Sequence, residues 1–177
     1  MGTRLRVSRP LVVVAFALLA ACASQRVSSQ AGKDESLVVI HLDLSRSPSY
    51  WRKVPLICED RRGERPWWNM HTDGDGLYFQ EGAPVGRCWI TGGFQDGIVT
   101  RIYKLPEKPS ENPTTLSIAK PGVHYMGSFK FEPTGGEDFR LVPTRAVSER
   151  EALKRVLPLT EGTGWNALVR RKLGAAR

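Results

Sequence analysis

The stretch Ser36–Leu44 reads SLVVIHLDL, and it decides the class of fold. It begins as a continuous apolar run and ends in alternation, with the polar residues His41 and Asp43 set between apolar neighbours. A period of two is typical of a β-strand, because successive side chains of a strand point to opposite faces of the sheet. The residues that follow, Ser45–Pro48, then indicate a turn.

Short segments of the same kind continue along the chain up to about residue 146. Turns rich in Gly and Pro separate them, and the chain holds 17 Gly and 12 Pro in its 177 residues. The further segments are Val54–Cys58, Trp67–His71, Leu77–Gln80, Gly86–Thr91, Gly97–Leu105, Thr114–Ala119, Val123–Glu132 and Phe139–Val142. We therefore expect about eight short strands, paired antiparallel through tight turns.

The pattern changes at Ser148, where a helical period replaces the alternation. Ser148 and Glu151 form a capping box, in which the serine hydroxyl accepts a hydrogen bond from the amide of the third helical residue. Two apolar stripes follow at helical spacing, and Pro158 ends the first. The stripes are Ala152, Leu153, Val156 and Leu157, and then Trp165, Leu168, Val169 and Leu173 behind a capping Thr163. Because such short helices are marginal alone, both should dock, with Trp165 as the largest buried side chain. The alternative is an exposed amphipathic helix that touches the membrane through Arg170, Arg171 and Lys172.

These elements predict a mostly β fold of the α+β class. We expect an antiparallel β-sandwich over residues 37–146 and a C-terminal pair of short helices, residues 147–177, packed on it. The segment Ala119–Gly127, AKPGVHYMG, resembles the strand–turn–strand element of prealbumin-like and carboxypeptidase-regulatory-like sandwich domains. This resemblance implies a sandwich and implies nothing about activity.

The N-terminus has the layout of an export signal. Three arginines precede Leu11–Ala21, an apolar stretch of 11 residues, whereas a membrane-spanning helix needs about 20. The stretch ends in Leu19-Ala20-Ala21-Cys22, which resembles the lipobox of bacterial lipoproteins. The alternative is an ordinary secretory signal, cut at the nearby A-x-A pattern, in which Cys22 has no special role.

The lipobox resemblance implies that residues 1–21 are removed as a signal peptide and that Cys22 is acylated, which anchors the protein to a membrane. In this family an Asp after the cysteine tends to retain the protein in the inner membrane. Ala23 and Ser24 stand there, so we expect the outer membrane, with the domain facing the periplasm. Residues 22–36 hold almost no large apolar side chains, so we expect a flexible tether.

Two cysteines remain after such processing, Cys58 and Cys88, each inside an apolar, strand-like run. An exported protein meets an oxidising compartment, so we expect a disulfide between them. The alternative is a pair of buried free thiols. A catalytic thiol is not indicated, because no arrangement of His with Asn or Asp lies near either cysteine in the sequence.

The charge pattern argues against nucleic-acid binding. Removing residues 1–21 takes away three arginines and no acidic residue, so the formal net charge falls from +8 to about +5. The basic residues are scattered, with dense runs only at Arg61-Arg62 and Arg170-Arg171-Lys172. A basic surface could meet anionic lipid, but for an exported chain with scattered charges a solvated surface with no nucleic-acid partner is favoured.

Candidates for catalysis or metal binding are few. Asp73-Gly74-Asp75 resembles the start of an EF-hand calcium loop, but Leu77 and Pro84 occupy later ligand positions, so a tight turn is expected. The histidines are His41, His71 and His124. Their spacing matches no zinc motif, and the sequence carries no hydrolase, P-loop or dinucleotide fingerprint. We therefore expect no catalytic residue, metal or cofactor.

Two functional hypotheses remain open. The first is a non-enzymatic, membrane-anchored lipoprotein that is structural or binds an envelope protein or glycan. The second is a small hydrolase whose site is assembled from residues distant in sequence, such as His71 with Asp73 and Asp75. Neighbouring Trp67 and Trp68 must point to opposite faces of a strand. If one of them is exposed, its ring could stack on a sugar or a peptide. We expect, however, that neighbouring loops cover both side chains. A pocket that gathers titratable groups favours the hydrolase, and an exposed aromatic patch favours the binding protein.

Overall fold

The computed structural model describes residue 27 and residues 30–48, 50–95, 101–135 and 138–175. The strands are β1 (Glu35–Asp43), β2 (Pro55–Asp60), β3 (Trp67–Asn69), β4 (His71–Thr72), β5 (Leu77–Pro84), β6 (Gly86–Ile90), β7 (Gly92–Gln95), β8 (Arg101–Lys104), β9 (Leu116–Ile118), β10 (Gly122–Gly135) and β11 (Asp138–Thr144). The helices are α1 (Glu149–Val156), the 3-10 helix η1 (Leu157–Thr160) and α2 (Gly164–Ala175). The expected mostly β fold with C-terminal helices is confirmed.

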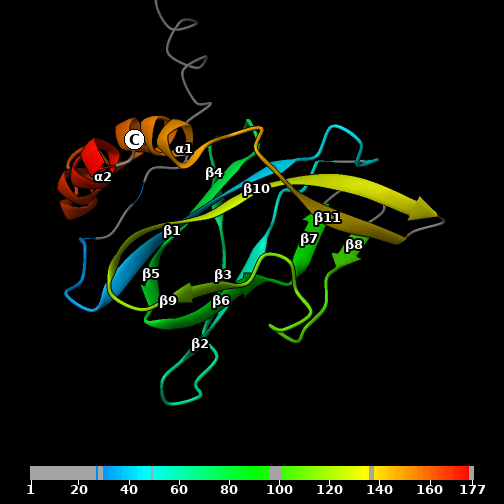
Figure 1. Ribbon diagram of the computed structural model, residues 1–177, viewed down its shortest axis with the longest axis horizontal. Coiled ribbons are helices and arrows are strands. Elements are labelled where there is room, and N and C mark those ends of the chain that lie inside the picture. Colours follow the sequence, from blue (N-terminus) through cyan, green and yellow to red (C-terminus); the bar gives the residue numbers. More distant parts are fainter. Residues whose placement is uncertain (1–26, 28–29, 49, 96–100, 136–137, 176–177) are drawn as a thin grey trace, which may run out of the picture.

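The strands form two main sheets and one hairpin (Figure 1). The five-stranded sheet has the order β11-β10-β1-β5-β4, the four-stranded sheet has the order β3-β2-β6-β9, and β7 pairs with β8. The expectation of purely antiparallel pairing is wrong at one place, since β1 and β10 run parallel. Parallel neighbours need a long connection, and here all the strands from β2 to β9, which include the whole second sheet, lie between β1 and β10 in the chain.

The segment that resembles the sandwich element lies where the chain changes sheets. Its first residues, Ala119–Pro121, lie between the end of β9 in the four-stranded sheet and the start of β10 in the five-stranded sheet. The predicted strand Trp67–His71 is divided in a similar way, because β3 joins one sheet and β4 joins the other. Met70, between them, is buried in the core. Such divisions raise the number of strands above the expected eight or so.

The five-stranded sheet is the middle of three layers, because β1 is buried on both faces. Val38, Ile40 and Leu42 belong to the core between the two sheets. Leu37 and Val39 point the other way and belong to a second core under the helices. The helices therefore cover one face of this sheet and the four-stranded sheet covers the other (Figure 1).

The helical layer forms as its sequence pattern predicts. The Ser148 hydroxyl accepts a hydrogen bond of 3.2 Å from the Glu151 amide, and α1 buries its predicted apolar stripe. The Thr163 hydroxyl accepts a bond of 3.2 Å from the Trp165 amide at the start of α2. The Trp165 side chain is 0% exposed and packs in the core under the helices. None of the helices that the structure describes is both long enough and apolar enough to cross a bilayer.

The expected tether is partly wrong. Within residues 22–36, Val27 is buried in the core under the helices, and its amide donates a hydrogen bond of 3.1 Å to the Leu159 carbonyl. Ala31 packs against the same core, and Glu35 already begins β1. A single apolar side chain can dock here because η1 and α2 form an apolar surface that receives it. The composition of residues 22–36 contains no information about that distant surface.

Candidate functional site

The outer face of the four-stranded sheet carries a row of large side chains. Trp67, Ile57 and Trp89 lie side by side across β3, β2 and β6, because Ile57 is paired with both tryptophans. Their neighbours Leu56 and Cys58 point inward to the core between the sheets. Trp67 is 63% exposed. The β7–β8 hairpin and the residues that follow it border this face, together with Lys53 before β2 and Arg65 in the turn between β2 and β3.

The β7–β8 hairpin forms a wall beside this row. The Phe94 amide donates a hydrogen bond of 2.8 Å to the Lys53 carbonyl, which ties β7 to the segment before β2. Gly93 lies so close to Trp51 that a Cβ atom there would be 2.1 Å from the indole ring. A glycine is therefore required for the hairpin to approach, and its approach brings Phe94 and Ile102 to the edge of the row.

Two adjoining depressions of about 370 and 340 Å³ share Ile57, Thr91 and Phe94 and together form one groove. We call it the Trp67 groove. Its apolar lining residues are Pro55, Ile57, Trp67, Trp89, Phe94, Ile102, Tyr103 and Leu105. Two large apolar side chains of this groove, Trp67 and Ile102, are exposed to solvent, and exposed apolar side chains that gather in one place favour an interaction site.

The rim of the Trp67 groove is mainly basic. Lys53, Arg65 and Lys104 line it, with Glu107 as the acidic member. At one end Glu59 accepts hydrogen bonds of 3.2 Å from both Arg65 and Arg87. A predominantly basic rim around an apolar floor favours a partner that carries apolar and acidic side chains.

The sequence predicted the opposite orientation of the two neighbouring tryptophans, and this prediction is confirmed. Trp68 packs against the core between the sheets, whereas Trp67 points outward. The expectation that loops cover both is wrong, because β3 is the edge strand of its sheet and the described residues leave one side of Trp67 open. The remaining groove residues were missed, since Phe94 and Ile102 reach the site only through the fold of the hairpin.

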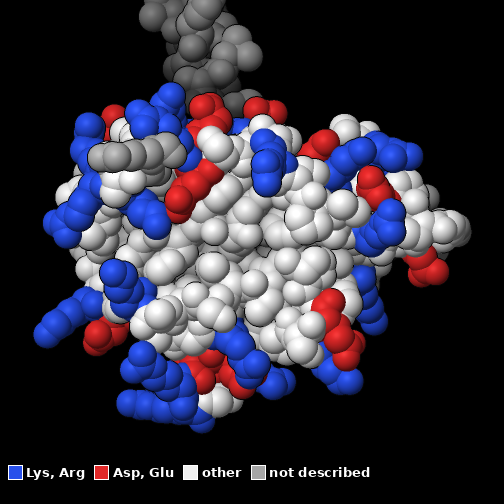
Figure 2. All heavy atoms as spheres, in the orientation of Figure 1, with Lys and Arg blue, Asp and Glu red and all other residues white. Residues whose placement is uncertain are grey.

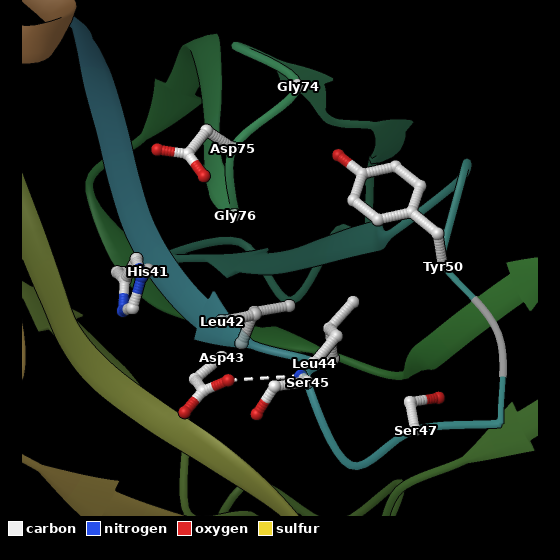
Figure 3. A pocket seen from close by; sticks show the side chains of 10 residues that line it. All are labelled: His41, Leu42, Asp43, Leu44, Ser45, Ser47, Tyr50, Gly74, Asp75 and Gly76. Carbon is white, nitrogen blue, oxygen red and sulfur yellow. Dashed lines mark hydrogen bonds between the residues drawn. The ribbon is translucent and has the colours of Figure 1, made fainter.

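A second concavity is polar and lies near the end of β1. This cleft, of about 450 Å³, is lined by side chains that include His41, Asp43, Tyr50 and Asp75 (Figure 3). In Figure 3 Asp75 and Tyr50 stand on opposite sides of the opening, and Asp43 and Ser45 lie below it. The cleft thus gathers titratable groups, which is the feature expected of the hydrolase hypothesis.

The carboxylates of the polar cleft serve local structure. Asp43 accepts a bond of 3.0 Å from the Ser45 amide, and hydrogen bonds from the side chain and backbone of Ser45 lower the pKa of Asp43. Asp73 accepts bonds of 2.8 and 3.0 Å from the Asp75 and Leu77 amides, which closes the expected tight turn. The other oxygen of Asp73 accepts a bond of 3.1 Å from Arg155 Nε, which fastens this turn to α1.

His41 is held inside the five-stranded sheet and turned toward β10 (Figure 3). Its Nδ1 lies 2.8 Å from the Ser128 hydroxyl, which in turn lies 2.9 Å from the Thr144 hydroxyl. Burial, followed by the positive charge of Arg155, lowers the pKa of His41 and favours the neutral ring. Ser128 is 3% exposed, so its hydroxyl does not face the cleft as a nucleophile would. This chain of hydrogen bonds joins β1, β10 and β11.

The residues named for the hydrolase hypothesis have separate partners. His71 Nε2 lies 3.7 Å from a carboxylate oxygen of Glu81, and its ring packs at 5.5 Å from that of Phe79. Asp73, in contrast, is bound to Arg155. The histidines lie on three different strands, β1, β4 and β10. Within the part of the chain that the structure describes, no three His, Cys, Asp or Glu side chains are grouped to hold a metal ion.

The two cysteines of the folded domain face each other across β2 and β6. Cys58 is paired with Cys88 in the register, and their sulfur atoms are joined at 2.08 Å. This disulfide lies on the inner face of the sheet, directly beneath the row that forms the floor of the Trp67 groove. The predicted lipidation site, Cys22, lies outside the described residues.

Comparison of the chain with protein families, with curated proteins and with solved structures finds no match. The function is therefore argued from the surfaces described above.

Proposed function

We propose that this protein is a lipid-anchored envelope lipoprotein whose sandwich domain binds a partner protein in the Trp67 groove. The exposed Trp67 above an apolar groove is the observation that carries the binding part of the proposal. Acylated Cys22 would attach the protein to the outer membrane, with the domain in the periplasm. The binding activity needs no cofactor, metal or catalytic residue.

The lipobox and the disulfide support the anchored part of the proposal independently. Leu19–Cys22 supplies the acylation pattern directly after a signal-like apolar stretch. The disulfide between Cys58 and Cys88 suits an oxidising compartment such as the periplasm, because structural disulfides are rare where thiols are kept reduced.

The lining of the groove favours a protein partner over a glycan. A glycan needs many polar side chains that donate and accept hydrogen bonds, whereas the floor here is formed by Ile57, Trp67 and Phe94. An exposed aromatic side chain in an apolar patch with a polar rim is typical of the residues that dominate protein–protein binding. The basic rim further favours an acidic partner segment.

The groove is tested by affinity capture of the tagged, full-length protein from cross-linked envelopes of cells that make it. We expect one protein to be recovered with the wild type and with the matched control Arg62→Ala, which changes an exposed side chain outside the groove lining. Trp67→Ala should reduce its recovery roughly tenfold or more, as expected of a dominant interface residue. Equal recovery with Trp67→Ala would contradict the proposed site, and loss of binding to purified cell-wall glycan with this variant would assign a glycan instead.

The anchor is tested separately with Cys22→Ser. This change should abolish incorporation of a labelled fatty acid and leave the signal peptide uncleaved, because both steps require the cysteine thiol. A control in which Ser24 is changed to Ala should be acylated normally. A Cys22→Ser protein that remains membrane-anchored and matures at the same site would refute the lipoprotein assignment.

A further inference from the structure

The docking of Val27 fixes where the folded domain begins. Its side chain is 3% exposed within the core that also contains Leu159 and Trp165, and its amide is bonded to the Leu159 carbonyl. Ala31 lies against the start of α2, since a Cβ atom placed on Gly164 would be 3.3 Å from the Ala31 Cβ. The chain therefore enters the domain on the side of the helices, opposite to the four-stranded sheet.

The distance from the anchor to this entry point is short. Only four residues separate Cys22 from Val27, and a fully extended chain advances at most about 3.6 Å per residue, so the two positions lie within about 18 Å of each other. A free tether over the whole of residues 22–36, as expected from composition, would allow a distance of about 50 Å between Cys22 and the domain at full extension. The side on which the chain enters the domain is therefore kept near the bilayer once Cys22 is anchored there.

The side on which the chain enters is also rich in positive charge. The segment from Glu149 to Ala175 holds six basic and three acidic residues. Two of its basic residues, Arg171 and Lys172, line a cleft of about 370 Å³. Lys120, in the turn before β10, and His124, near the start of β10, line the same cleft. Figure 2 shows Lys and Arg side chains gathered over the helices at the upper left.

The cleft combines the features of a headgroup site. Lys172, which lines the cleft, forms an ion pair of 3.2 Å with Glu149, whereas Lys120 and Arg171 supply the further positive charge of the cleft. Leu168 and Pro121 give the cleft an apolar part. Basic side chains are attracted to anionic lipids when they lie within about a Debye length of the membrane, roughly 8–10 Å. A tether that spans at most about 18 Å keeps the helical side of the domain near enough to the bilayer for these side chains to come within that length.

We propose that the helical layer is a membrane-facing surface and that the cleft of Lys120, Arg171 and Lys172 binds the phosphate groups of anionic lipids. The proposal rests on the proposed acylation of Cys22. The three-layer order then points the Trp67 groove away from the membrane, because the groove lies on the outer face of the layer farthest from the helices. The protein would thus present its binding groove to the periplasm in a fixed orientation.

The test uses the mature, acylated protein in vesicles of phosphatidylcholine, with or without phosphatidylglycerol. A donor dye is attached to a cysteine introduced by Glu161→Cys beside the helices, or by Arg62→Cys in the turn between β2 and β3, and the acceptor is a dye-labelled lipid headgroup. We expect severalfold stronger energy transfer from position 161 than from position 62, with a further increase from position 161 when phosphatidylglycerol is present. Equal transfer from both positions, or stronger transfer from position 62, would overturn the proposal.

Charge variants test the cleft itself. Lys120→Gln, Arg171→Gln and Lys172→Gln combined should remove the increase caused by phosphatidylglycerol, whereas the matched combination Arg61→Gln, Arg62→Gln and Arg65→Gln should retain it. An unchanged increase in the first variant would exclude the cleft as the headgroup site. A protein that carries no acyl chain by mass and does not sediment with vesicles would refute the anchor instead, so the two failures are distinguishable.

Discussion

The two sheets of this protein differ in how their faces are covered. In β1, at the centre of the five-stranded sheet, every residue from Ser36 to Leu42 is buried, because the other sheet covers one face and the helices cover the opposite face. In β2, within the four-stranded sheet, Leu56 and Cys58 are buried, whereas Ile57 between them is only half-buried. The first sheet packs against both other layers, and the second has a partly open outer face, which is the face on which we propose that a partner binds.

This difference is already visible in the two sequences. The run LVVI of β1 is apolar on both sides, as is typical of a strand that is covered on both faces. In the run PLICED of β2 the positions that face away from the core include the apolar Ile57 as well as the polar Glu59. Ile57 lies beside other apolar side chains on this outward face, Trp67 and Trp89, and such a grouping favours an interaction surface.

The largest expected difference in stability is between two tryptophan substitutions, one in the core under the helices and one on the outer face of the four-stranded sheet. Trp165→Ala should lower the free energy of unfolding by about 3–5 kcal/mol, because a fully buried aromatic side chain leaves a cavity. Trp67→Ala should change it by no more than about 0.5 kcal/mol, as expected of an exposed side chain. Urea unfolding followed by circular dichroism measures both values. An unchanged midpoint for Trp165→Ala would reject the structural role of the helical layer.

A second effect concerns the disulfide that lies beneath the Trp67 groove. The bond between Cys58 and Cys88 spans 30 residues, and the loop-entropy relation gives about 3–4 kcal/mol for a loop of this length. The double change Cys58→Ala and Cys88→Ala should therefore lower the free energy of unfolding by about this amount. Thiol titration of the denatured, unreduced protein provides the direct check. Two reactive thiols at these positions would contradict the bond.

A smaller effect is expected from pH in the five-stranded sheet. The pKa of His41 is lowered by burial and by Arg155, and the pKa of His124 is lowered mainly by burial, so the unfolded chain binds protons more readily than the folded one. The stability that these residues contribute is present above the ordinary histidine pKa of about 6.5 and is lost as the pH falls below it.

The check is chemical unfolding at a series of pH values. The free energy of unfolding of the wild type should decrease between about pH 7 and pH 5, and His41→Gln should show a smaller decrease, because glutamine does not titrate. A pH dependence that is identical in His41→Gln and in the wild type would show that His41 does not contribute.

The helices and the core strands were predictable because their patterns are local. Ser148, Glu151 and the two apolar stripes specify α1 and α2 within a few residues of each element. The alternation and turns likewise indicate most of the strands. The opposite directions of the Trp67 and Trp68 side chains follow from the geometry of a strand alone.

Contacts between distant segments could not be predicted in this way. The parallel pairing of β1 with β10 joins residues about 85 positions apart, for example Val38 and His124, and nothing in either segment specifies its partner. The burial of Val27 depends on a surface that η1 and α2 create. The Trp67 groove likewise exists only because Gly93 lets the β7–β8 hairpin approach Trp51, which places Phe94 at the sheet.

We propose that partner binding belongs to the open face of the four-stranded sheet and not to the helical layer. The most direct measurement is photo-crosslinking in living cells from a photoreactive residue at Ile102, on the edge of the Trp67 groove, compared with one at Glu161 beside the helices. The account predicts a discrete protein adduct from position 102 that is lost with Trp67→Ala, and no such adduct from position 161. A protein adduct from position 161 alone, with none from position 102, would contradict it.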